Sequence, residues 1–261
     1  MKDVQKTKPD FQYPIQRVGI SNLTIPISLS MKDGGMQNSV ANVNVFVDLK
    51  PESKGTHMSR LAIGIQKFMD QQLNQKLLKD IAEYIRLKCE AETCEISYTF
   101  PYFLKKLAPI SKEPGLAHSN VTFTLIKSKE SSIFTMSVET TSTSLCPCSK
   151  EISDGQGAHN QRSKITISCQ PMEHKWIWIE DLIDIAERNA SCEIFSVIKR
   201  PDEKAVTQQA YNNPKFVEDI IRGVYHNMIN PMNTEWFRIE VRNEESIHYH
   251  DAYASIDTRN Y

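Results

Sequence analysis

Alternating hydrophobic and polar residues predict several β-strands in this chain. The clearest run is residues 41–49, ANVNVFVDL, where Ala, Val and Leu occupy every second position. This period is typical of a strand with one buried face. Comparable runs predict further strands at 94–103, 121–127, 133–142, 163–169, 193–199, 235–242 and 246–256.

Hydrophobic residues spaced three and four apart predict helices between these strands. One helix is expected over 60–73, and a second begins after Asn74, whose side chain is suited to cap it. The two are expected to pair as a hairpin. Two more helices are expected at 179–190 and at 214–229.

The order of these elements favours an α+β protein with antiparallel sheet, because helices interrupt the strands without alternating regularly with them. The coarse order of strand, helix and strand occurs in both halves, although no residue-level repeat is visible. We therefore expect two tandem modules, residues 1–145 and 146–261, with one continuous domain as the alternative.

Composition and charge narrow the class of protein. The chain has 261 residues, of which 40% are hydrophobic and 24% charged, and its net charge is −1. No apolar run approaches the ~20 residues of a membrane span, and MKDVQKTKPDFQYP at the start lacks the apolar core of a signal peptide. We expect a cytoplasmic protein without a membrane or nucleic-acid partner.

The stretch 144–163, SLCPCSKEISDGQGAHNQRS, contains the most distinctive chemistry. Cys146, Cys148 and His159 lie within one polar loop, and thiolate with imidazole suits a metal such as zinc. Cysteines are also often buried and inert, so from spacing alone a metal site and a turn that contains cysteines both stay open. The C-x-C spacing excludes a C-x-x-C redox pair and the P-C-x-x-C of zinc deaminases.

Other polar motifs each have a simpler explanation. KRPDEK, which contains Glu203, is typical of a solvated turn, and Glu218 near a helix start is explained by the helix dipole. His248 and His250 are expected on one face of a strand, as a surface pair. The six cysteines lack the spacing of a secreted disulfide framework, so we expect reduced thiols. A Gly-rich phosphate loop, G-x-S-x-G and H-E-x-x-H are absent from the sequence.

Taken together, several blocks resemble, in order, the type IB GTP cyclohydrolases I. They are GTHMSR, SLCPCSKEIS, GAHNQRS, ASCEIFSVIKRPDEKAVTQQAYNNPKFVEDIIR and ESIHYHDAYA. The resemblance implies a tunnelling fold, with antiparallel sheets and paired helices on one face. It also implies a homo-oligomer, with a tetramer expected and active sites at subunit interfaces. The implied reaction hydrolyses GTP to 7,8-dihydroneopterin triphosphate and formate, the first step of tetrahydrofolate biosynthesis.

The resemblance also implies roles for individual residues. A divalent metal (zinc, manganese or iron) would be held by Cys146, His159 and Glu203. The groups implied in catalysis are Cys146, Glu245 and His248, and Glu218 is implied in guanine binding. His250, next to His248, is also expected as a proton donor, because histidine titrates near neutral pH. Lys150, Arg162 and Lys204 lie near these motifs and are expected to bind the triphosphate through their charge. The loop between Cys146 and His159 is one residue longer than the family pattern, and Cys148 has no implied role.

Two alternatives stay open. One is a sister tunnelling-fold enzyme that acts on a pterin or deazapurine. The other is a non-catalytic module in which Cys146, Cys148 and His159 form a closed structural zinc site, with no position for water.

Overall fold

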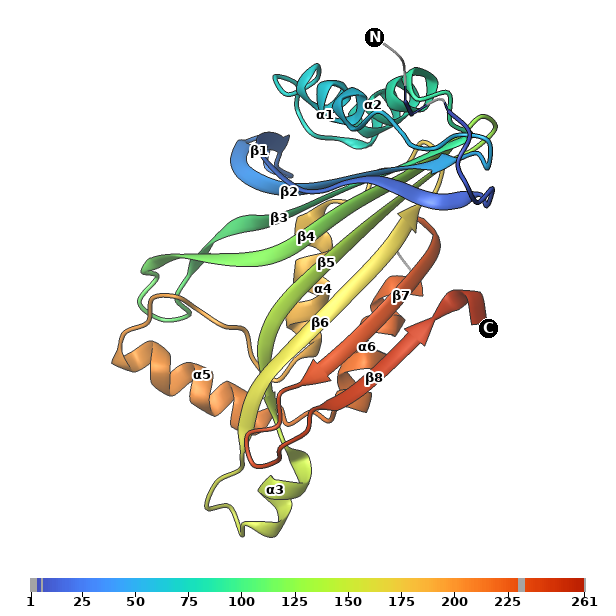
Figure 1. Cartoon of the computed structure of the whole chain (residues 1–261). Helices are drawn as coiled ribbons and strands as arrows, with labels where there is room; N and C mark the ends of the chain where they lie inside the picture. The colour runs from blue at the N-terminus through green and yellow to red at the C-terminus, as the bar shows by residue number, and fades with distance from the viewer. Residues whose placement is uncertain (1–3, 6, 230–232, 261) are drawn as a thin grey trace. The chain divides into compact units, whose positions relative to one another are not determined.

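The computed structural model describes residues 4–5, 7–229 and 233–260 (Figure 1). Eight strands of this described part form one sheet, in which neighbours follow chain order from β1 to β8. The strands are β1 (Ile15–Ser30), β2 (Met36–Leu49), β3 (Thr93–Leu107), β4 (Pro114–Ser128), β5 (Ser132–Leu145), β6 (Asn160–Pro171), β7 (Thr234–Asn243) and β8 (Ala252–Asp257). The pairs β1–β2, β2–β3, β6–β7 and β7–β8 are antiparallel.

The chain divides into two compact units, each described here by itself. One holds the residues up to 101 together with 122–136, and the other holds 102–121 together with 137–261. Strands β3, β4 and β5 contribute residues to both units. These units do not follow the boundary at residue 145, and the tandem modules 1–145 and 146–261 stay a prediction.

The first unit packs two helices together, α1 (Met58–Gln66) and α2 (Gln75–Lys88). The Asn74 carboxamide accepts the Leu77 N–H at 2.9 Å, so the expected helix cap is confirmed. The helices approach closely at Gly64, where a Cβ would lie 2.4 Å from Cγ1 of Ile85. The predicted helix hairpin is therefore confirmed, although α1 ends at Gln66 rather than near residue 73.

The second unit places α4 (Ile179–Asn189) and α6 (Val217–Ile229) on one face of β6, β7 and β8 (Figure 1). Alternate residues of these strands are buried and build the core, among them Ile165, Ile167, Ile239 and Val241. Three further elements complete the unit: α3 (Pro147–Ile152), α5 (Arg200–Asn212) and the 3₁₀ turn η1 (Thr258–Asn260).

The α+β class is confirmed, and the predicted strands at 41–49, 94–103, 121–127, 133–142, 163–169 and 235–242 lie within strands of the structure. The strand predicted at 193–199 is wrong, because these residues form a connection; nearby, Cys192 makes an isolated bridge with Thr143. β1 and α5 were not predicted. Pro26 disfavours a central strand, but β1 lies at the sheet edge, where proline is tolerated.

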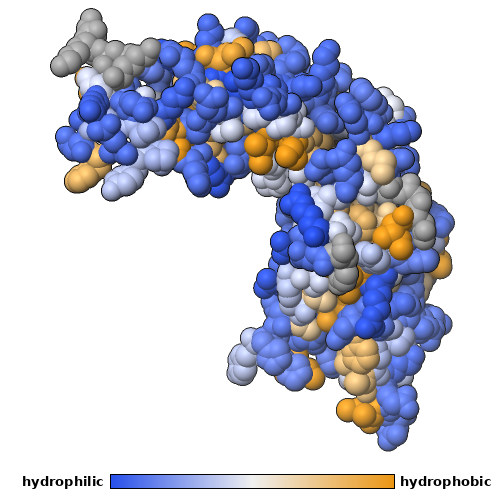
Figure 2. Space-filling model, turned by 90° about the vertical axis from the view of Figure 1, so that its right-hand side faces the viewer, coloured by the Kyte–Doolittle hydropathy of each residue, from blue (hydrophilic) through white to orange (hydrophobic). Residues whose placement is uncertain are grey.

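None of the helices in the described residues is long and apolar enough to cross a membrane. On the face shown in Figure 2, hydrophilic residues predominate and hydrophobic residues form separate patches. All six cysteines lie in the described part and are free thiols, as expected.

Candidate active site

The end of β5 and the start of β6 bring Cys146 and His159 together. Cys146 caps α3 in an extended conformation, followed by Pro147 in the first turn, where a missing N–H is tolerated. The Cys146 N–H donates to the His159 carbonyl at 3.1 Å, and its Sγ accepts the Ser149 N–H at 3.4 Å. The His159 N–H donates to Ser149 Oγ at 3.2 Å. The segment from Cys146 to His159, which contains α3, therefore returns so that its two ends are hydrogen-bonded to each other.

Glu245 approaches the same imidazole from the end of β7. Asn243, the last residue of β7, pairs with Ser163 of β6, so the residues after β7 continue beside the start of β6. His159 Nδ1 lies 3.7 Å from Glu245 Oε2, and these side chains are only 12% and 14% exposed. Gln161 completes the group, with its Oε1 2.9 Å from Nδ1.

A buried hydroxyl joins this group to the start of α6. Ser144 Oγ accepts hydrogen bonds from the side-chain amides of Gln161 at 3.3 Å and Asn243 at 3.1 Å. It donates to the Lys215 carbonyl at 3.1 Å, and the Lys215 N–H donates to the Leu145 carbonyl at 3.0 Å. The segment before α6 is therefore fixed to the end of β5, next to Cys146.

Glu218 lies three residues beyond Lys215, exposed in the first turn of α6. Its neighbour Asp219 accepts the Phe216 N–H at 3.0 Å and thus secures the helix start. The structure therefore places the predicted guanine-binding carboxylate at a helix end that is anchored beside Cys146.

His248 and His250 lie in the loop between β7 and β8, so the prediction that both belong to a strand is wrong. β8 begins only at Ala252, and the loop residues form turns instead of ladder pairs. The two rings nevertheless stack, with centroids 5.0 Å apart and planes 18° from parallel. The His248 N–H is 3.4 Å from the Glu245 carbonyl, so the pair stays next to Glu245.

Asp202 fixes the start of α5, although KRPDEK suggested a solvated turn. Its fully buried carboxylate accepts the N–H groups of Ile110, Ser111 and Lys199, each at 2.8 Å, and the Ser111 hydroxyl at 2.6 Å. Burial opposes ionisation, but these hydrogen bonds, led by those of Ser111, hold the pKa of Asp202 well below its usual range. α5 is thereby attached to the loop between β3 and β4.

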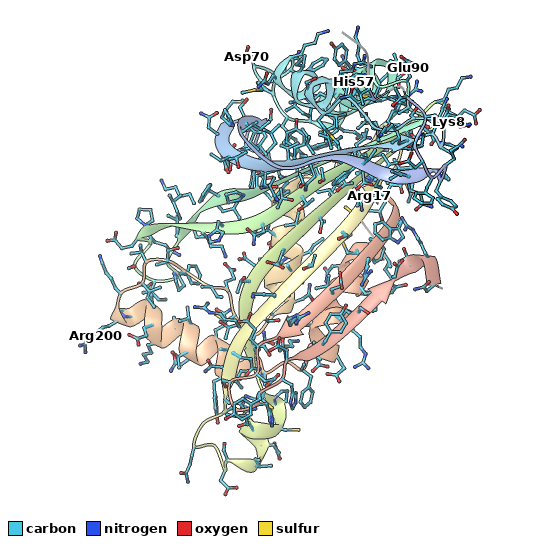
Figure 3. The ribbon with its side chains drawn as sticks, viewed as in Figure 1. Lys8, Arg17, His57, Asp70, Glu90 and Arg200 are labelled. Atoms are coloured by element: carbon cyan, nitrogen blue, oxygen red, sulfur yellow. The ribbon has the colours of Figure 1, made fainter. Side chains whose placement is uncertain are left out.

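Glu203 and Lys204 follow Asp202 and are exposed on the first turn of α5. Figure 3 shows Arg200 at the end of α5 away from α3. Tyr211, near the other end, accepts a hydrogen bond from Lys150 Nζ through its carbonyl at 2.6 Å. Glu203 and Tyr211 are eight positions apart in the helix, a rise of about 12 Å along its axis. Among the described residues, no three His, Cys, Asp or Glu side chains are grouped to hold a metal.

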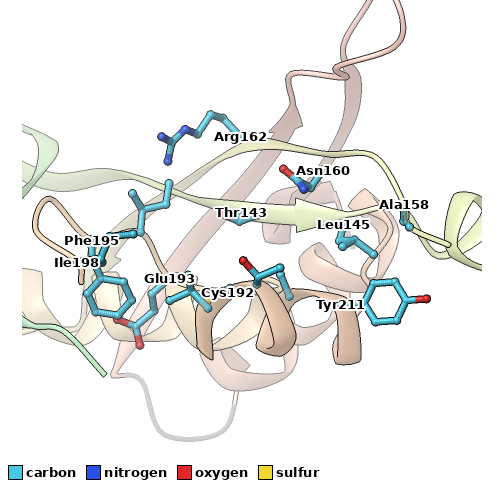
Figure 4. A pocket seen from close by; sticks show the side chains of 15 residues that line it. Thr143, Leu145, Ala158, Asn160, Arg162, Cys192, Glu193, Phe195, Ile198 and Tyr211 are labelled. Atoms are coloured by element: carbon cyan, nitrogen blue, oxygen red, sulfur yellow. The ribbon is translucent and has the colours of Figure 1, made fainter. Parts of the chain in front are cut away.

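A pocket of about 410 Å³ lies between the β5–β6 strands and α5 (Figure 4). Arg162 lines it from β6, whereas the neighbouring Gln161 contacts Ser144 and Glu245 on the other face of the strand. Cys192 also lines the pocket, and burial, with a smaller contribution from Glu193, raises the pKa of its thiol to about 11. This thiol is therefore protonated at neutral pH.

The donor set around His159 fits a metal in part. A thiol and an imidazole are two of the ligand types that zinc uses together with carboxylates. Gln161 and Glu245 both approach Nδ1, so Nε2 is the nitrogen suited to a ligand bond. Within one chain, the described residues group Cys146 with His159 but do not add Glu203 to them.

Sequence reasoning missed the polar residues that support the site. Gln161 and Ser163 continue the alternation of the buried residues Ile165 and Ile167 along β6. Polar residues at positions expected to be buried were therefore the sequence feature that could have revealed them. Ser144 and Asn243 are likewise buried strand residues. The side-chain amides of Gln161 and Asn243 donate to Ser144 of another strand, and Ser144 donates to Lys215 before α6. The pattern of one strand does not reveal such partners.

Solved structures of low sequence identity share this fold. The urate oxidase from Bacillus sp. TB-90 is 8% identical, with a TM-score of 0.52 over 93% of this chain and 100% of that chain. A second crystal structure of that enzyme gives a TM-score of 0.51 over 93% and 99%. This likeness supports the tunnelling fold expected from the sequence and carries no conclusion about activity.

Curated relatives match the whole chain. The GTP cyclohydrolase FolE2 of Desulfosudis oleivorans is 43% identical over 257 residues, which cover 98% of this chain and 97% of that protein. The GTP cyclohydrolase FolE2 of Nitrosomonas eutropha is 45% identical over 256 residues, which cover 98% and 94%. A family model described as type I GTP cyclohydrolase folE2 matches residues 1–254. Because the match spans nearly every residue, this chain belongs to the type I GTP cyclohydrolase folE2 family.

Proposed function

We propose that this chain is a GTP cyclohydrolase I of the type IB kind. It hydrolyses GTP to 7,8-dihydroneopterin triphosphate and formate, the first step of tetrahydrofolate biosynthesis. The observation that carries the proposal is that the Cys146 backbone bonds to His159, whose imidazole lies beside Glu245, in a chain that the family model matches over residues 1–254. The relatives from Desulfosudis oleivorans and Nitrosomonas eutropha, both named GTP cyclohydrolase FolE2, are 43% and 45% identical to this chain.

The metal in this proposal is zinc, manganese or iron, held by Cys146, His159 and Glu203. A mixed set of thiolate, imidazole and carboxylate ligands accommodates all three metals. When bound, the metal supplies activation of a water molecule for hydrolysis of the guanine ring. The turn that hydrogen-bonds Cys146 to His159 and both to Ser149 supports this assignment.

Glu218 is the residue proposed to bind guanine. Its carboxylate would accept hydrogen bonds from N1 and N2 of guanine, a donor pair that adenine does not have. Support comes from its place in the first turn of α6, a helix whose preceding segment is hydrogen-bonded to the end of β5.

Residues in the loop after β7 are the proposed proton donors and acceptors. The imidazole ring of guanine is a poor electrophile until N7 is protonated, and histidine is a suitable donor near neutral pH. His248 and His250 stack on one another beside Glu245. We assign these three residues to proton handling at the site.

Arg162, Lys150 and Lys204 are the residues proposed for the triphosphate. Arg162 is the best supported, because it lines the pocket between the β5–β6 strands and α5 (Figure 4). Lys150 donates one hydrogen bond to the Tyr211 carbonyl and lies 4.4 Å above the Tyr211 ring. An ammonium carries three donors, so Lys150 retains donors for a phosphate.

A homo-oligomer, with a tetramer as the expected state, would complete the site at a subunit interface. Two features support this. Glu203 lies at the end of α5 remote from Tyr211 and is not grouped with Cys146 in one chain. Ile152 of α3 and Ile247 and Tyr249 of the β7–β8 loop are strongly exposed, and burial of such apolar groups against another subunit would be favourable.

The tandem modules 1–145 and 146–261 gain support from a shared detail of helix packing. Each half contains a helix pair with a glycine where a Cβ would overlap the partner helix: Gly64 against Ile85, and Gly223 against Asn189 of α4. A Cβ at Gly223 would lie 2.3 Å from Asn189 Oδ1. A cytoplasmic location completes the proposal.

Incubation of the purified protein with GTP and each metal in turn tests the function. We expect formate in equal amount to a pterin that becomes fluorescent after oxidation. A sister enzyme would yield another product from another substrate, and a structural zinc module would bind metal without turnover. Absence of the pterin with zinc, manganese and iron alike would overturn the proposal.

A further inference from the structure

The carboxamide of Gln161 lies between three functional groups of the site. Gln161 is only 7% exposed. Its Oε1 is 2.9 Å from His159 Nδ1, while its Nε2 is 3.3 Å from Ser144 Oγ and 3.5 Å from Glu245 Oε1. One buried amide therefore connects the imidazole, the carboxylate and the hydroxyl.

The neighbours of this amide determine which of its ends carries hydrogen. Ser144 has a single hydroxyl hydrogen, and the Lys215 carbonyl, which can only accept, takes it at 3.1 Å. Ser144 Oγ must therefore accept from Gln161, and an ionised Glu245 can only accept as well. Nε2 consequently faces Ser144 and Glu245, which leaves Oε1 facing His159.

An amide oxygen beside Nδ1 selects one tautomer of the His159 ring. Because Oε1 only accepts, Nδ1 must carry the hydrogen, and the lone pair of the neutral ring then lies on Nε2. Glu245 Oε2, at 3.7 Å from Nδ1, is beyond hydrogen-bond distance but close enough for its charge to favour an N–H at that position.

We propose that Gln161 is a positioning residue that holds His159 in the tautomer presenting the Nε2 lone pair and ties Glu245 to the same ring. The His159 N–H bond to Ser149 and the Cys146 N–H bond to the His159 carbonyl fix the backbone, and Gln161 fixes the ring. The use of Nε2 for metal binding rests on the proposed function, whereas the tautomer does not.

Nuclear magnetic resonance of the metal-free protein tests the tautomer directly. In long-range ¹H–¹⁵N spectra of histidine-labelled protein at mildly alkaline pH, we expect His159 to show a protonated Nδ1 and an unprotonated Nε2. The signals are assigned by their loss in His159→Gln. An Nε2–H pattern, or an even mixture of tautomers, in the unaltered protein would overturn the proposal without any Gln161 variant.

Two substitutions then separate tautomer control from simple packing. Gln161→Leu removes the acceptor and should give a mixture of tautomers, whereas Gln161→Glu keeps an acceptor and should preserve Nδ1–H. Zinc affinity, measured by competition with a chelator, should fall about 10- to 100-fold in Gln161→Leu, as for other residues that orient a ligating histidine. Gln156→Leu, on the exposed loop before His159, should change neither.

The two proposals fail in distinguishable ways. If no pterin forms but His159 is held as Nδ1–H in the metal-free protein, the proposed function fails and the positioning role of Gln161 stands. If pterin forms while Gln161→Leu leaves both the tautomer and the zinc affinity unchanged, the positioning role is wrong and the function stands.

Discussion

Ser111 and Asp202 are joined by two hydrogen bonds, from the Ser111 N–H at 2.8 Å and the Ser111 hydroxyl at 2.6 Å. Ser111 lies in the loop between β3 and β4, and Asp202 lies in the first turn of α5. The pair therefore sets the position of α5, and with it the side chains of Glu203 and Lys204 that follow Asp202 in the sequence.

Asp202→Asn should lower the melting temperature at neutral pH and loosen the start of α5. The pKa of Asp202 is depressed in the folded state, so its stabilising effect is complete above the unfolded value of about 4. It is lost as the pH falls toward the folded-state pKa. The difference in melting temperature between the variant and the unaltered protein should thus shrink below about pH 4.

Thermal unfolding followed by circular dichroism across this pH range measures the effect. Asp154→Asn, in the exposed loop after α3, serves as the matched control and should not alter the melting temperature. A constant difference at every pH would show that the Asp202 carboxylate is not the source of the effect.

Cys146→Ala should abolish pterin formation, whereas Cys148→Ala should retain most of it. Cys146 is half-buried and adjoins His159, while Cys148 is exposed in α3. Steady-state turnover and bound-metal content should fall together in Cys146→Ala, with unchanged circular dichroism. Equal losses in both variants would contradict the assignment of Cys146 as the single thiolate ligand.

Glu218→Gln should raise the KM for GTP more than it lowers kcat. Loss of a hydrogen bond to a charged group costs about 1.5–3 kcal/mol, or roughly tenfold to a hundredfold in binding. Glu151→Gln, at an exposed position of α3, provides the control. A KM unchanged from that of the unaltered protein would remove Glu218 from guanine recognition.

Gly64→Ala should destabilise the first unit by about 1–3 kcal/mol through overpacking. The new Cβ would lie 2.4 Å from Ile85 Cγ1 and 2.9 Å from its Cδ1. Adding Ile85→Ala removes both atoms, so the two substitutions together should cost less than the sum of their separate effects. Urea unfolding measures this coupling, and Gly55→Ala, whose Cβ would lie 3.6 Å from Gln5, is the control.

The strands and helices with strong periodicity were predictable because their burial follows one local rule. Alternation at 41–49 and helical spacing after Asn74 both correspond to elements of the structure. α5 was not predicted because its sequence has little hydrophobic periodicity. The helix start is instead held by Asp202, whose partners Ile110 and Ser111 lie about ninety residues earlier. A long-range hydrogen bond leaves no periodic signal in either segment.

The neighbouring positions of Cys146 and His159 were predictable, because both lie in one segment of the sequence. Contacts between residues of different strands were not. Cys146 and His159 were expected together and are together. The contact of Gln161 with Glu245, by contrast, arises from the register of β6 and β7, which pairs Ser163 with Asn243. Register depends on the whole sheet, so a motif search finds the ligands but not the residues that orient them.

Gln161 and Arg162 lie on opposite faces of β6, and this alternation determines where a residue can be inserted into the chain without disturbing the fold. An added residue among 153–158, in the loop before β6, leaves the strand register intact. The same addition after Gln161 would exchange the two faces of β6 and turn Ile165 and Ile167 out of the core. Length variation among relatives is therefore expected before His159 and should stop at β6.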